Sequence, residues 1–133
     1  MIRNRSMPPG VIIPELPCDD VNVAAAWLCQ AFGFKERLRI GNHRCQLTFG
    51  ETSVVAIEPK EPGISSVLVH VEEVDDHCER AKQSGPRIIH PPTDDPFGER
   101  QYTVEDPGGH RWTFSQTIGD VDPKTWGGIL FED

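Results

Sequence analysis

Two stretches decide the fold of this chain: DDVNVAAAWLCQAFGF at residues 19–34 and EEVDDHCERAKQSGPR at residues 72–87. In each, apolar residues recur at spacings of three and four, and a glycine follows, Gly33 in the first and Gly85 in the second. This pattern predicts a helix with one apolar face that ends at a left-handed glycine. Asp20 can cap the first helix. The two helices take the same place in two successive β-α-β-β-β units, so the chain contains an internal repeat.

Short strands surround both predicted helices. The expected strands are VIIPELP (11–17), FKERLRI (34–40), CQLTF (45–49) and SVVAIEP (53–59) in the first unit, and SVLVHV (66–71), RIIH (87–90), RQYTVE (100–105) and HRWTFSQ (110–116) in the second. Pro14 and Pro17 predict that the first strand is short or lies at a sheet edge. The first eight to ten residues are expected to form a loose tail, and residues 119–133 a C-terminal extension with two apolar anchors, Trp126 and Phe131.

Length and charge exclude several classes of protein. The 133 residues suit one domain, with modules at about 11–60 and 65–118. The net charge of -8 and the absence of a basic run disfavour binding to nucleic acid or to an anionic membrane. Because there is no spanning apolar segment and no export signal, we expect a cytoplasmic protein whose four cysteines stay reduced.

Three motifs carry a resemblance to a known family: WLCQAFGFKE (27–36), VDDHCERAKQSGPRII (74–89) and VEDPGGHRWTF (104–114). With the repeat, they resemble the vicinal-oxygen-chelate superfamily, which includes glyoxalase I, bleomycin-resistance proteins and extradiol dioxygenases. The resemblance covers residues 11–118 and implies an α+β fold. Two βαβββ modules would form an open, half-barrel sheet around a cavity, with the helices outside. It also implies a homodimer, in which the cavity is often shared between chains.

The resemblance implies four positions for ligands of a divalent metal, and these positions fall on Ile13, Ala56 or Glu58, Ser66 and Thr113. Isoleucine cannot bind a metal, and serine and threonine hydroxyls are poor ligands for such an ion. We therefore expect that the family metal site is missing and that there is no cofactor. The alternative is a relocated site made by Glu15, Glu58 and His70, since residues two apart on a strand share a face.

With no metal, the cavity is expected to hold a small organic molecule. The expected apolar lining is Ile13, Val54, Ala56, Leu68 and Thr113. The segment TDDPFGERQY (93–102) resembles the mobile segment that closes over the cavity in related proteins, which would bring Phe97, Arg100 and Tyr102 to the ligand. Phe97 and Tyr102 could equally pack the domain. The candidate ligand-binding residues are Glu15, Glu58, Ser66, His70, Arg100, Tyr102, Arg111 and Thr113.

The other histidines are interpreted as structural or solvated. If Thr113 points inward, then Arg111 and Ser115 do too, while His110, Trp112 and Phe114 face a helix. His110 is then expected to brace the turn formed by residues 106–109. His43 and His77 are expected to be solvated, and His90 precedes two prolines that keep the chain extended.

Three functions remain open from the sequence. The first is a binding protein of the glyoxalase and bleomycin-resistance type that holds a small molecule without the family metal. The alternative is a lyase, isomerase or dioxygenase of the same superfamily, with a relocated metal or with His70 and Glu58 as an acid–base pair. The third is a protein-interaction role through a dimer face or the extension that carries Trp126.

Overall fold

The computed structural model describes residues 2–59, 66–107 and 109–131. The first unit contains β1 (Ile12–Pro17), α1 (Val21–Phe32), β2 (Lys35–Ile40), β3 (Arg44–Phe49) and β4 (Thr52–Ile57). The second contains β5 (Ser66–His70), α2 (Val74–Lys82), β6 (Arg87–Asp95), β7 (Glu99–Glu105) and β8 (Arg111–Thr117). The extension forms a 3-10 helix, η1 (Pro123–Trp126), and a last strand, β9 (Gly128–Leu130).

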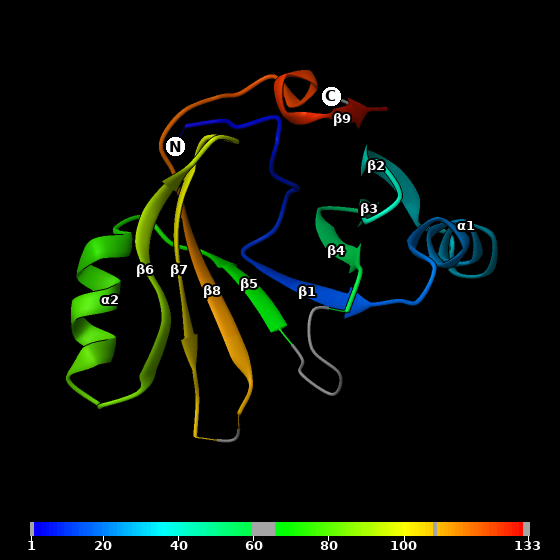
Figure 1. The fold of residues 1–133 in the computed structure, drawn as a ribbon. Coiled ribbons are helices and arrows are strands. Elements are labelled where there is room, and N and C mark those ends of the chain that lie inside the picture. Colours follow the sequence, from blue (N-terminus) through cyan, green and yellow to red (C-terminus); the bar gives the residue numbers. More distant parts are fainter. Residues whose placement is uncertain (1, 60–65, 108, 132–133) are drawn as a thin grey trace.

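The strands form one open sheet in the order β6-β7-β8-β5-β1-β4-β3-β2-β9. The two units meet at β1 and β5, which pair in antiparallel fashion with Ile13 opposite Leu68, so the units join within one chain. The helices lie outside the two arms of the curved sheet, with α2 beside β6 and α1 beside β2 (Figure 1). The predicted α+β architecture with an open sheet is confirmed.

Each helix covers the outer face of its own unit. The side chain of Asp20 accepts a hydrogen bond from the Val23 amide at 3.0 Å and begins α1. Gly33 ends α1 with φ of 78°, and its amide bonds back to the Cys29 carbonyl. The cores under the helices consist of Val21, Ala25, Cys45, Leu47 and Ala56 under α1, and Val74, Cys78, Tyr102 and Val104 under α2.

Two strands differ from their predictions. Strand β1 is central rather than at an edge, because it pairs with β5 over Ile12–Glu15 and with β4 over Glu15–Pro17. The part of β1 that pairs with β4 begins at Glu15, after Pro14. The amide hydrogen that Pro14 lacks therefore removes no hydrogen bond between β1 and β4. Strand β6 runs on through Pro91 and Pro92 as the edge strand of the sheet, where proline is tolerated.

The C-terminal extension docks on its own chain. Strand β9 pairs with β2, with Leu38 opposite Leu130, and extends the first unit by one strand. The Trp126 ring lies 5.4 Å from that of Phe97, which follows β6 in the second unit. In Figure 1 the extension (orange to red) passes over the space between the two arms, and the N-terminal segment (blue) runs beside it. The extension therefore contacts both units.

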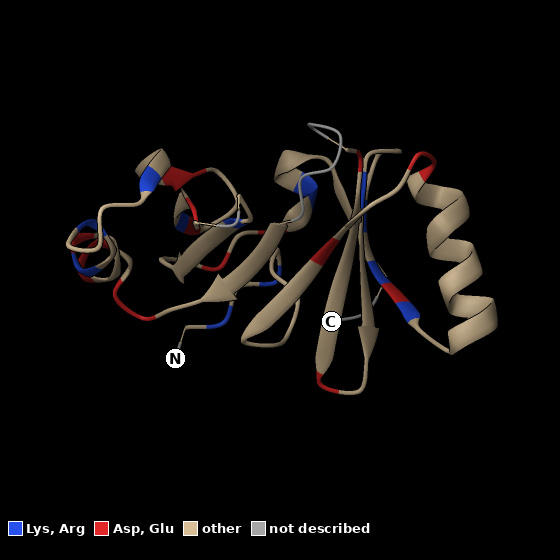
Figure 2. Cartoon of the chain, turned by 90° about the horizontal axis from the view of Figure 1, so that it is seen from below, with Lys and Arg blue, Asp and Glu red and all other residues tan. Residues whose placement is uncertain are grey.

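The two helices differ in their charged residues. Helix α1 contains no lysine, arginine, aspartate or glutamate, whereas α2 carries both signs (Figure 2). On the outside of α1, the side chains of Val23, Trp27 and Phe32 are exposed. In the part of the chain that the structure describes, no helix is long and apolar enough to cross a membrane.

Candidate functional site

The concave face of the sheet has an apolar centre where the two units meet. Ile13, Val55, Ile57 and Leu68 form one buried cluster there, and Met7 of the N-terminal segment packs against it. Residues alternate in direction along a strand, so the neighbouring Val54 and Ala56 point to the other side, where they contact the core under α1. The expectation that Val54 and Ala56 line the cavity is therefore wrong by one residue of register.

Buried polar side chains flank this apolar centre on both arms. In the first unit the Arg37 guanidinium donates to the Gln46 side chain at 2.6 Å, and Ser53 lies one strand further on. In the second unit Gln101 donates to the Ser115 hydroxyl at 2.9 Å. Gln46, Ser53, Gln101 and Ser115 alternate with helix-facing residues, and Arg37 lies at the β-bulge of β2. The concave face thus combines an apolar floor with hydrogen-bonding sides.

The N-terminal segment, residues 4–9, lies across this face. The Gln46 amide donates to the Ser6 carbonyl at 2.8 Å, and the Arg37 guanidinium to the Arg5 carbonyl at 3.1 Å. The Ser53 hydroxyl donates to the Pro9 carbonyl at 2.6 Å. The prediction of a loose tail is wrong, because side chains of the sheet bind the backbone of this segment.

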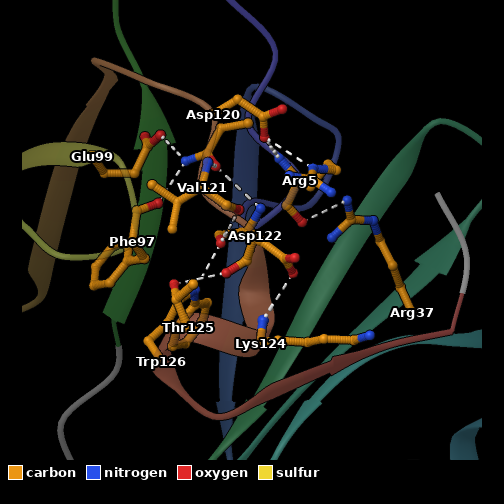
Figure 3. Close-up of polar contacts among 12 residues, drawn as sticks. Arg5, Arg37, Phe97, Glu99, Asp120, Val121, Asp122, Lys124, Thr125 and Trp126 are labelled. Atoms are coloured by element: carbon orange, nitrogen blue, oxygen red, sulfur yellow. Dashed lines mark hydrogen bonds and ion pairs between the residues drawn. The ribbon is translucent and has the colours of Figure 1, made fainter.

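The C-terminal extension holds the other side of the same segment (Figure 3). The Arg5 amide donates to the Asp120 carboxylate at 2.9 Å, and the Val121 amide to the Asn4 side-chain oxygen at 3.1 Å. The Ser6 hydroxyl donates to the Val121 carbonyl and accepts a hydrogen bond from the indole of Trp126. The segment is therefore enclosed between the sheet and the extension.

A carboxylate with no exposed surface lies under this enclosure. Glu99 is 0% exposed, and it accepts hydrogen bonds from the hydroxyls of Ser115 and Thr117, both at 2.7 Å. The side-chain amide of Asn4 donates to the same carboxylate at 2.8 Å and to the Phe97 carbonyl at 2.7 Å. Glu99 thus joins the N-terminal segment to strands β7 and β8.

A groove of about 990 Å³ opens beside the N-terminal segment. Residues 2–4 and 7–11 form one wall, and the ends of strands form the other with Arg37, Thr48 and His70. Two carboxylates, Glu72 and Glu73, stand at the rim ahead of α2. The volume suits a small organic molecule, and the lining offers both apolar contacts and groups of either charge.

Comparison with known proteins identifies the family. The family model described as Glyoxalase/Bleomycin resistance protein/Dioxygenase superfamily matches residues 11–114, which is most of the chain. The chain belongs to this superfamily. A search of curated proteins found no match.

Solved structures of this superfamily share the fold. A superfamily member from Vibrio splendidus 12B01 is 20% identical with a TM-score of 0.61, over 80% of this chain and 97% of that one. Methylmalonyl-CoA epimerase from Streptomyces coelicolor is 13% identical with a TM-score of 0.66, over 84% and 96%. A mutant of 4-hydroxymandelate synthase from the same organism is 22% identical with a TM-score of 0.64, over 87% and 41%. At these identities the likeness concerns the fold alone.

The residues of the concave face do not fit the metal site that the glyoxalase superfamily implies. Ile13 lies in the apolar cluster, and the inward residue at the end of β4 is Ile57 rather than Ala56 or Glu58. Ser66 and Thr113 supply only hydroxyls, which form hydrogen bonds to Glu15 and Thr103. Two of the four positions have no donor atom and two have weak ones, so the set cannot bind a divalent ion as in the metal-dependent members.

The relocated site is not assembled either. Among the residues that the structure describes, no three His, Cys, Asp or Glu side chains come close enough to hold a metal ion. Glu15 pairs with Arg44 at 3.2 Å and accepts from Ser66 at 2.7 Å. Glu15 lies opposite Ser66, which is four residues from His70 on β5. At about 3.3 Å per residue, Glu15 and His70 are therefore roughly 13 Å apart along the strand.

The predicted ligand-binding residues fall into three groups. The first group lies near one end of β1, β5 and β8 and consists of Glu15, Ser66, Arg111 and Thr113. Ser66 is opposite both Glu15 and Arg111, and Thr113 is two residues further along β8. His70 lies at the other end, in the groove, with Nε2 at 3.4 Å from the Pro8 carbonyl. The third group, Glu58, Arg100 and Tyr102, does not reach the concave face.

Glu58, Arg100 and Tyr102 are not brought to the cavity. Glu58 is exposed beyond the end of β4. On β7 the inward residues include Gln101, whereas Arg100 pairs with Asp75 and Asp94, and Tyr102 is buried under α2. Residues 93–102, expected as a mobile closing segment, form the β6–β7 hairpin. Burial raises the pKa of Tyr102 to about 12, so its phenol stays protonated at neutral pH.

Two histidines in the second unit have clear structural roles. His110 Nδ1 lies 3.1 Å from the Asp106 carboxylate, which also accepts from the Trp112 indole, so His110 braces the turn as predicted. His77 is not solvated as expected, because its ring packs against those of Phe114 and Tyr102, with Nδ1 at 2.5 Å from the tyrosine hydroxyl. Burial lowers the pKa of His77, which favours the neutral ring.

The sequence analysis missed the residues that bind the N-terminal segment, namely Arg37, Gln46, Ser53 and Glu99. The alternation in ERQYTVE could have identified Glu99, because Tyr102 and Val104 as core residues put Glu99 on the opposite face. No comparable signal marks residues 4–9, which have neither a period nor an apolar run.

Proposed function

We propose that this glyoxalase-superfamily protein binds a small organic molecule in the groove beside His70, without the family metal. The observation that carries the proposal is the groove of about 990 Å³ on a scaffold whose metal-ligand positions hold Ile13, Ile57, Ser66 and Thr113. The scaffold keeps a cavity of ligand size while its metal donors are lost. Binding without metal chemistry is the function that these two features support together.

The acid–base alternative has less support. It needs His70 and Glu58 close to the same substrate atom, but Glu58 is exposed beyond the end of β4. A proton transfer requires its acid or base within about 3 Å of the reacting atom. The groove instead places His70 with the carboxylates Glu72 and Glu73, which suits recognition of a polar group on a ligand.

The test is a thermal-shift screen of a metabolite library with two tryptophan variants. Val11 lines the groove and is 68% exposed, so Val11→Trp places a large ring in the groove and obstructs it without disturbing the core. Ile129→Trp adds the same side chain on β9, outside the groove and outside α1, where Ile129 is 56% exposed. A compound at one hundred times its dissociation constant stabilises the folded state by roughly 2.7 kcal/mol.

We expect hits that raise the melting temperature of the wild type and Ile129→Trp but not of Val11→Trp. Hits that stabilise Val11→Trp equally would place the binding site elsewhere and refute the proposal. Mass spectrometry of each hit after incubation separates the two classes of function. Recovery of unchanged compound supports a binding protein, and conversion to a product would assign the groove to an enzyme.

We also infer that the protein forms a homodimer through α1. The helix has no charged residue, and Trp27, 55% exposed, lines a shallow apolar groove of about 450 Å³ with Leu16 and Val23. In a two-fold dimer this uncharged patch would contact the same patch of the second chain. The contact would then bring no charged side chains of α1 together, although each chain has a net charge of -8.

Light scattering is expected to give a dimer for the wild type and a monomer for Trp27→Glu. Ile129→Glu, on exposed β9, should remain dimeric, and a monomeric wild type would contradict the inference.

A further inference from the structure

The concave face binds main-chain atoms of the N-terminal segment through side chains. Three sheet residues donate hydrogen bonds to carbonyls: Arg37 to Arg5, Gln46 to Ser6 and Ser53 to Pro9. The three donors come from three adjacent strands, β2, β3 and β4, and all three are buried. Hydrogen bonds to main-chain carbonyls allow a protein to hold a peptide whatever the peptide's side chains are.

Three side chains of the segment are recognised separately. Met7 packs on the apolar cluster that contains Ile13 and Leu68. The Ser6 hydroxyl bonds to the Val121 carbonyl and the Trp126 indole, both below 3 Å. The Asn4 amide is held by Glu99 and by the Phe97 carbonyl. The concave face and the C-terminal extension therefore contact Asn4, Ser6 and Met7 through their side chains.

The bound segment is stiff and extended at its C-terminal end. Pro8 and Pro9 follow Met7 and limit the backbone to extended conformations, which lowers the entropy lost on binding. Gly10, at φ of 117°, then turns the chain into β1. The segment thus resembles a short peptide ligand joined to its own receptor by one glycine.

We propose that the concave face is a peptide-binding site for a segment of the pattern Asn-x-Ser-Met-Pro-Pro, which turns over its first four residues, with the Met7 amide bonded to the Asn4 carbonyl at 3.1 Å, and that residues 4–9 occupy this site in cis. The same peptide supplied as a separate molecule competes with the tethered segment. This site lies under the segment, whereas the groove proposed for small molecules lies beside it and uses residues of the segment as one wall. The peptide site is tested by peptide binding and the groove by compound binding, so failure of one proposal is distinguishable from failure of the other.

The experiment uses the full-length chain and a fluorescein-labelled peptide of residues 2–10. The double variant Asn4→Ala/Ser6→Ala removes the two polar anchors of the tethered segment and leaves the sheet unchanged. By fluorescence anisotropy, this variant is expected to bind the peptide at least about tenfold more tightly than the wild type, whose site is occupied by its own segment. A control peptide with Met7→Asp should bind neither protein, because it places a charge on the apolar cluster.

A double variant that keeps the wild-type circular dichroism spectrum but does not bind the peptide would overturn the proposal. If the variant unfolds, a protease site inserted between Gly10 and Val11 of the full-length wild type replaces it. After cleavage, the fragment should stay bound during gel filtration and exchange with the labelled peptide. Loss of the fragment from a folded protein that does not take up the labelled peptide would equally overturn the proposal.

Discussion

Replacing Gly98 by alanine is expected to cost about 3 kcal/mol of the free energy of unfolding, because it combines backbone strain with a steric clash. Gly98 has φ of 85°, a conformation that L-residues rarely adopt. A Cβ atom there would lie 2.5 Å from the Gly119 carbonyl and 2.9 Å from the Asn4 side chain. The Gly119 carbonyl belongs to a backbone that is itself bonded to Gly98, so it cannot move away independently.

Urea unfolding of Gly98→Ala beside Gly85→Ala separates the two causes. Gly85 has a similar φ of 73°, but nothing lies within 4 Å of its would-be Cβ. Gly85→Ala should therefore cost only about 1 kcal/mol, the conformational part. Equal losses in the two variants would mean that the N-terminal segment and residue 119 do not press on Gly98 in solution.

The second large effect is expected for Glu99→Ala, which should also lose about 3 kcal/mol of the free energy of unfolding. The substitution removes the acceptor of Ser115, Thr117 and Asn4 at a position with no exposed surface. Buried donors without an acceptor carry their full desolvation cost, and the missing side chain leaves a cavity. Equilibrium unfolding in urea measures the loss.

Two further variants identify the cause of that loss. Glu99→Gln keeps the volume and one acceptor oxygen, so we expect it to cost about 1 kcal/mol. Glu51→Ala, in an exposed turn, should change stability by less than about 0.5 kcal/mol. If Glu99→Gln destabilises as strongly as Glu99→Ala, the negative charge rather than the hydrogen bonding holds this region together.

The fold was predictable where the sequence carries a clear period. The helices follow from apolar spacing and the left-handed glycine at Gly33, and RWTFSQT alternates so regularly that Trp112 and Phe114 could be placed under α2. The run SVVAI in β4 does not alternate, so the choice between Val54 and Val55 as inward residue was open, and the wrong register was chosen.

The candidate site was less predictable, because it depends on contacts between distant parts of the chain. Asn4 bonds to Glu99 and to Val121, 95 and 117 residues away. Such contacts leave no local pattern at either end. Arg100 and Tyr102 were assigned to the cavity by analogy with a closing segment, although the alternation of β7 already placed Tyr102 with the core residues.

The enclosure of residues 4–9 also sets an order for folding during synthesis. The Ser6 hydroxyl donates to the Val121 carbonyl and accepts from the Trp126 indole, so it joins residues that are made 115 and 120 positions apart. Local structure in each unit can form early, but contacts of such long sequence separation form late. Until residue 126 has left the ribosome, the apolar cluster around Ile13 and Leu68 has no complete cover, and the nascent chain exposes it to chaperones and to other chains.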